Sequence, residues 1–135
     1  MRQPASIEPL ERRCDRTRDA LAALTRLLEA ARRRSGLDAL AVAEKAGLLV
    51  AGAGPAGLCD ELAAHAPLTT RSAANDRVPS RLDIVERRAL VQRLAIDGIE
   101  IVLCGVGGGP EAEHELRAVA AGCRRILGEQ ARPRE

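Results

Sequence analysis

The chain has 135 residues, which is enough for one domain with a single hydrophobic core. It contains no Phe, Trp or Tyr, and this absence argues against single-stranded nucleic-acid binding, in which bases stack on aromatic rings. The formal net charge of +2 favours neither nucleic acid nor a membrane surface, and no apolar run reaches the ~20 residues that a membrane helix needs.

The first predicted element is a long helix over residues 7–34. Apolar residues recur at spacings of three and four from Leu10 to Ala31, which is typical of one buried helical stripe. Ser6 is suited to cap its start, and Gly36 is suited to end it. Such a helix is longer than a small sheet, so part of the stripe is predicted to meet another chain. The candidate dimer-interface residues are Leu10, Cys14, Leu21, Leu24 and Leu28.

Two short strands are predicted next, over residues 38–44 and 48–53, joined by a link of hairpin length that contains a glycine. A shorter helix over residues 55–66 follows and is predicted to end at Pro67, because proline breaks the helical hydrogen-bond pattern. Residues 69–81 are polar and contain a further proline, which predicts a loop.

The strongest local signal is the pair Asp97-Gly98 between two alternating apolar runs, which predicts a type I′ hairpin turn. This turn pairs Ile96 with Ile99, and the register continues through Leu94 with Ile101 and Gln92 with Leu103. A slip of one residue would move every side chain to the opposite face, so the turn and the apolar pattern agree on one register. Strands are therefore predicted at 90–96 and 99–105.

A further strand is predicted at residues 83–88, and a last helix runs from the glycine-rich segment 107–110 to about Leu127, with Gly128 as its stop. The element order predicts a single α+β domain over residues 6–128, with flexible tails at 1–5 and 129–135. We expect a two-layer fold in which the first and last helices pack on one face of an antiparallel central sheet.

Residues 52–57 read GAGPAG, which matches the dinucleotide-binding pattern G-x-G-x-x-G at Gly52, Gly54 and Gly57. The pattern follows a predicted strand and opens a predicted helix. However, the segment after that helix is neither a strand nor acidic at the position that would hold a ribose, and Asp60 and Glu61 lie near the helix start. A strand-to-helix turn is the preferred interpretation, with dinucleotide binding kept as an alternative. No cofactor is therefore expected.

Other chemical signals are weaker. His114-Glu115 begins like a zinc-protease motif, but position 118 is alanine, and His65 lies beside the apolar face of its helix. The four cysteines have no metal-type spacing and no secretory segment precedes them, so reduced thiols in a cytoplasmic protein are expected. The arginine triplet 32–34 is interpreted as solvated surface charge, with a docking patch for an acidic partner as the alternative. No catalytic constellation is found, and the chain is predicted not to be an enzyme.

The predicted order, with GLDALAVA at residues 36–43 leading to GLLVA at 47–51, resembles the roadblock/LC7 family. The resemblance spans about residues 20–127 and implies a profilin-like, roadblock-like domain. It also implies a non-enzymatic homodimer that docks a small Ras-like GTPase or another signalling protein, or that scaffolds a larger assembly. GAF domains are the second choice, because residues 94–105 are equally similar to their strand–turn–strand element. That choice would imply a small-molecule sensor.

Overall fold

The structure is a computed structural model that describes residues 7–69, 79–84 and 86–131. Its elements are α1 (Ile7–Ser35), β1 (Leu37–Glu44), β2 (Leu49–Ala53), α2 (Ala56–Thr69), β3 (Ser80–Ile84), β4 (Arg87–Ile96), β5 (Ile99–Gly107) and α3 (Ala112–Ala131). The predicted flexible tail at 1–5 and most of the predicted loop at 69–81 lie outside the described residues, as do residues 132–135 of the tail predicted at 129–135, whose first three residues belong to α3.

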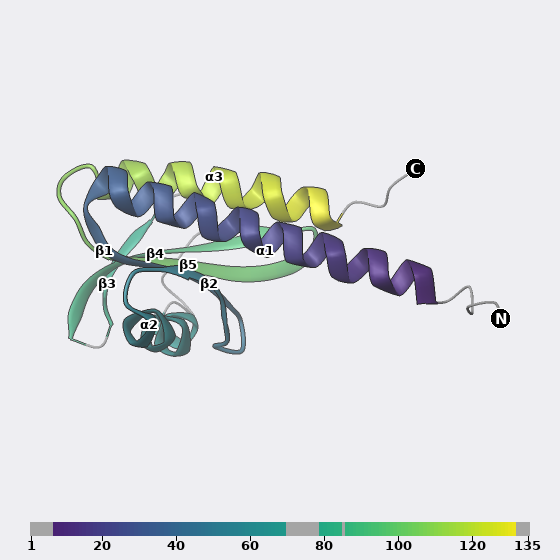
Figure 1. Ribbon diagram of the computed structural model, residues 1–135. Helices are drawn as coiled ribbons and strands as arrows, with labels where there is room; N and C mark the ends of the chain where they lie inside the picture. The colour runs from purple at the N-terminus through teal and green to yellow at the C-terminus, as the bar shows by residue number, and fades with distance from the viewer. Residues whose placement is uncertain (1–6, 70–78, 85, 132–135) are drawn as a thin grey trace.

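The five strands form one antiparallel sheet in the order β2-β1-β5-β4-β3. α1 and α3 lie side by side on one face of this sheet, as predicted, and α2 lies on the opposite face (Figure 1). The predicted α+β class is confirmed. β2 and β3 are the two edge strands, since each has a sheet neighbour on one side only.

The Asp97-Gly98 turn has the geometry that its sequence predicts. Asp97 and Gly98 have φ values of 50° and 84°, and a type I′ turn requires positive φ at both central residues. Ile96 pairs with Ile99 across the turn, and the predicted pairs Leu94–Ile101 and Gln92–Leu103 are also present. The register prediction for this hairpin is therefore confirmed.

Three predicted boundaries are wrong. The strand expected at 83–88 spans the turn between β3 and β4, which includes Glu86 at a φ of 60°. Pro67 lies inside α2 and does not end it, because within the last turn a proline removes only one helical hydrogen bond. Gly128 likewise lies inside α3, which continues to Ala131. Glycine ends a helix where the chain takes a left-handed turn, and Gly128 has no such positive φ.

Strand residues alternate between two cores. Leu40, Leu94 and Leu103 point to the α1 and α3 side, where they meet Leu24, Leu28, Leu116 and Val119. On the other face, Ala39, Ala41, Ala89 and Cys104 meet Cys59, Leu62 and Ala66 of α2. The face with α1 and α3 is thus built from large side chains and the α2 face mainly from small ones.

α1 and α3 approach each other closely because α3 carries a glycine at the contact. A Cβ atom at Gly122 would lie 2.7 Å from Cδ2 of Leu27 on α1. At the other end of the molecule, the first turns of α1 extend beyond both α3 and the sheet (Figure 1). Of the described helices, none combines the length and apolar character needed to cross a bilayer.

Candidate functional site

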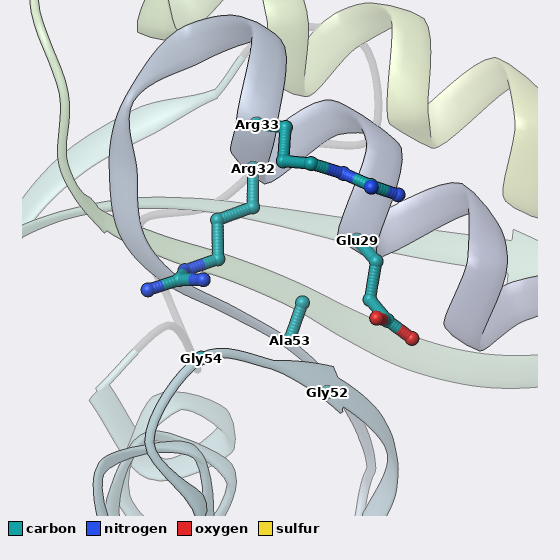
Figure 2. A pocket seen from close by; sticks show the side chains of 6 residues that line it. All are labelled: Glu29, Arg32, Arg33, Gly52, Ala53 and Gly54. Carbon is teal, nitrogen blue, oxygen red and sulfur yellow. The ribbon is translucent and has the colours of Figure 1, made fainter.

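A hollow of about 300 Å³ lies between the C-terminal half of α1 and the edge strand β2. The residues that line it come from α1, from β2 and from the position just after β2: Glu29, Arg32, Arg33, Gly52, Ala53 and Gly54. Figure 2 shows Arg32 and Glu29 extending from α1 toward the strand, while the methyl group of Ala53 points up toward the helix. The hollow therefore has a basic rim above and a strand backbone below.

The glycines of this hollow are required by packing. A Cβ atom at Gly52 would lie 3.0 Å from the Sγ atom of Cys59, so glycine lets α2 pack closely under the strand. Gly54 has a φ of +110°, and a Cβ there would lie 2.6 Å from the carbonyl oxygen of Asp38. Packing therefore explains why both positions are glycine, and no bound phosphate is needed to explain them.

The topology also differs from a dinucleotide-binding unit, in which the next strand lies parallel and adjacent to the first. Here the strand after α2 is β3, at the opposite edge of the sheet from β2. Gly57 lies in the first turn of α2, and a Cβ there would meet no atom within 4 Å. The three glycines are close in space, but the structure places no second parallel strand beside them.

The arginines come from the triplet 32–34, whose members have different surroundings. Arg32 Nε donates a hydrogen bond to the carbonyl oxygen of Asp38 at 3.0 Å. Arg34 leaves the site and forms an ion pair with Glu115 at the start of α3, with an Nη2–Oε1 distance of 2.6 Å. Arg33 is exposed and forms no ion pair with any residue that the structure describes.

The sequence favoured surface charge over an acidic partner's docking patch for this triplet, and it did not distinguish the three arginines from one another. Glu29, Arg32 and Arg33 have helical spacing, so they could have been placed near one another. The sequence carries no signal that this side of α1 faces the edge strand β2.

The predicted dimer-interface residues separate into two groups. Leu24 and Leu28 are fully buried in the chain's own core, where they contact the sheet and α3. Leu21 is 36% exposed and lies one helical turn before Leu24 on α1. Leu10 and Cys14 belong to α1, but their side chains lie outside the described part of the structure.

The other sequence candidates are dispersed. His65 lies on α2 and His114 on α3, both exposed and on opposite faces of the sheet. Cys59, Cys104 and Cys123 are buried free thiols, and burial raises the pKa of both Cys104 and Cys123 to about 12. Within the described residues, no group of three or more His, Cys, Asp or Glu side chains is placed to hold a metal ion.

A second feature adjoins the hollow along β2. Leu48 and Leu49, at the start of this strand, are 65% and 37% exposed. The neighbouring hairpin carries Ile99, which is 57% exposed. Lys45 Nζ lies 3.7 Å from Glu100 Oε2, so the β1–β2 and β4–β5 hairpins meet at this end of the sheet. The start of β2 is thus beside exposed apolar side chains, and its end is beside the arginines of α1.

Comparisons with known proteins identify the fold. No protein-family model and no curated protein sequence matches the chain. Among solved structures, the chain is similar to Myxococcus xanthus MglB, with a TM-score of 0.59 and 9% sequence identity. The match covers 85% of this chain and 95% of that one. The domain therefore has a roadblock-like fold, as its sequence pattern indicated.

Proposed function

We propose that the chain is a non-enzymatic, homodimeric regulatory module that docks a small Ras-like GTPase. The observation that carries this proposal is the roadblock-like fold, which extends over most of the chain. The sequence resemblance to the roadblock/LC7 family implies the same role, and the structural likeness to MglB supports it at the level of a regulatory domain.

The arrangement of reactive groups also favours a binding role over catalysis. The described histidines are on different elements and on opposite faces of the sheet, and the described thiols are buried. Burial disfavours the thiolate, which is the nucleophilic form of cysteine. A nucleophile and a general base would have to be within hydrogen-bond reach of each other, and these groups are not arranged in that way.

The test of GTPase docking uses the Ras-like GTPases encoded in the same genome, each loaded with GDP or with GppNHp. Biolayer interferometry on the full chain should detect one of them, with an affinity that depends on the bound nucleotide. If none binds in either nucleotide state, GTPase docking is wrong.

For the dimer, we propose the projecting part of α1 as the interface. The stripe that forms core at Leu24 and Leu28 continues in sequence through Leu21 to Cys14 and Leu10, beyond the sheet. Leu24 and Leu28 already fill the chain's own core, so Leu21, Cys14 and Leu10 are the candidates left for a partner. An apolar stripe along one side of a helix is typical of a helix–helix contact.

Sedimentation velocity tests the dimer and its interface together. The wild-type chain should sediment as a dimer, Leu21→Glu should sediment as a monomer, and Leu68→Glu, which alters an exposed leucine on α2, should remain dimeric. A wild-type monomer at all concentrations would contradict the dimer. A dimer disrupted by Leu68→Glu but not by Leu21→Glu would place the interface on α2.

A further inference from the structure

β2 is an edge strand with a free side. Among the residues that the structure describes, β1 is its one sheet neighbour, so alternate residues of β2 turn their backbone N–H and C=O groups away from the sheet. Such groups can pair with another extended chain, and natural proteins protect most edges with charged side chains, bulges or covering elements. At β2 the cover consists of α1 over one face and α2 under the other, which leaves the hollow between α1 and the strand.

Side chains do not obstruct this edge near the hollow. Gly52 and Gly54 have none, and Ala51 and Ala53 are buried against the α1 and α3 core. A second backbone can therefore approach β2 to the inter-strand distance of about 4.8 Å without displacing a side chain of the strand.

The charge above this edge is basic. Arg32 uses its Nε on the carbonyl oxygen of Asp38, and this bond aims the guanidinium toward Gly54 (Figure 2). Arg33 adds a second guanidinium that no described acid neutralises, and Glu29 is the single carboxylate among the lining residues. Two arginines against one glutamate leave a surplus positive charge, and guanidinium groups bind carboxylates through paired hydrogen bonds.

The other end of β2 is apolar. Leu48 and Leu49 are exposed there. Leu49 pairs with Ala43 and Ala53 pairs with Leu40, with a bulge in β2 at Val50, so the two positions are three residues of β1 apart, about 10 Å at the rise of an antiparallel strand. The edge thus offers an apolar contact and a basic contact one short strand apart.

We propose that the β2 edge binds an extended acidic segment of a partner protein by strand addition. Its backbone pairs with β2, an apolar side chain packs on Leu48 and Leu49, and an Asp or Glu side chain meets Arg32 and Arg33. A free small anion would use the arginines alone, whereas an extended peptide uses the unpaired backbone, the glycines and the apolar end together. This surface goes beyond the proposed GTPase docking, and its occupant is a linear segment instead of a folded domain.

The first experiment selects ligands from a displayed library of short random peptides against the immobilised full chain. The sequences enriched by wild-type protein should combine an acidic residue with an apolar residue about three positions away. No enrichment over empty beads, or enrichment without this spacing, overturns the proposal.

The second experiment measures one selected peptide by fluorescence anisotropy against charge variants. Arg33→Glu should weaken binding at least about tenfold, because it replaces an attraction with a repulsion of similar size, and Glu29→Gln should strengthen it. Arg117→Ala/Arg125→Ala, on the exposed side of α3, should leave the affinity unchanged. Equal losses in the α3 control would reveal non-specific attraction and overturn the site. Circular dichroism verifies that each variant is folded, and Arg33 makes no described contact that its replacement would break.

The third experiment separates strand addition from ion pairing without changing the protein. Two versions of the selected peptide carry N-methyl groups at alternate residues, one at the odd and one at the even positions. Strand addition predicts that one version loses binding and that the other retains it, since only alternate N–H groups face β2. Retained binding by both versions contradicts strand addition. Because GTPase binding is measured separately, either proposal can fail while the other holds.

Discussion

The two faces of the sheet solve the same packing problem with side chains of different size. Toward α1 and α3 the strands present leucines, which two long helices cover. Toward α2 they present mainly alanine, valine and cysteine, and one short helix covers them. In a chain without aromatic residues, volume on the first face comes from many leucines, and close contact on the second comes from small residues. The first face should tolerate loss of volume poorly, and the second should tolerate gain of volume poorly.

The largest effect is expected from Leu28→Ala, which should lower the free energy of unfolding by about 2–5 kcal/mol. Leu28 is fully buried between two helices and the sheet, so the cavity cannot collapse. Leu62→Ala is the matched change on α2, and it should cost less because α2 is a single helix that can settle toward the sheet. Urea denaturation of both variants measures the difference. A greater loss for Leu62→Ala would show that the α2 face is the more rigid one.

Alkaline pH should destabilise both faces through their buried thiols, Cys123 toward α1 and α3, and Cys59 and Cys104 toward α2. Burial raises the pKa of Cys123, on the α1 and α3 face, and of Cys104, on the α2 face, to about 12 from 9.0. The folded state then holds protons that the unfolded state releases, so stability is full below pH 9 and falls as the pH rises toward 12. The expected loss is about 1 kcal/mol per thiol for each pH unit in this window.

This pH effect can be assigned to cysteine thiols because the chain has no tyrosine and Lys45 is its one lysine. Burial also raises the pKa of Cys59, so a smaller thiol contribution should remain when Cys104 and Cys123 are replaced. Urea denaturation at pH 8 and pH 10 should show a clear loss of stability for the wild type. Cys104→Ala/Cys123→Ala should be less stable at pH 8 but should depend less on pH. An unchanged pH dependence in this double variant would rule out these two thiols as its source.

Overpacking tests the second face. Ala41→Leu should cost about 1–3 kcal/mol, because Ala41 is fully buried beneath α2 and pairs with Gly52 on one side and Cys104 on the other. Ala95→Leu serves as the control: Ala95 is an exposed residue of β4 and should change stability by less than about 0.5 kcal/mol. Thermal denaturation compares them, and equal melting temperatures would mean that α2 moves aside freely.

The smallest effect is expected for the ion pair between α1 and α3. Arg34 is 57% exposed, so its pair with Glu115 should contribute less than about 1 kcal/mol. A double-mutant cycle with Arg34→Ala and Glu115→Ala isolates the coupling energy. A coupling well above this value would mean that the pair, as well as the leucine core, holds the two helices together.

Local chemistry predicted the features that depend on adjacent residues. The Asp97-Gly98 turn and the alternation on either side of it specify the β4–β5 register, and Gly36 marks the end of α1, where its N–H donates to the carbonyl oxygen of Arg32. The hollow between α1 and β2 was not predictable in this way. It forms where α1 passes the β2 edge, and that placement depends on tertiary packing. Gly128 and Pro67 were misread because each is compatible with a helix in its context.

The contact between Leu27 and Gly122 has a consequence for how this fold can vary. A methyl group at position 122 would overlap Leu27, so the separation of α1 and α3 is determined by both positions together. Any relative that carries alanine or serine at 122 should carry a shorter residue at 27, and an isolated change at either position should be rare. Searching sequences for this paired change at positions 27 and 122 would identify the same helix pair even where the rest of the sequence is too divergent to align.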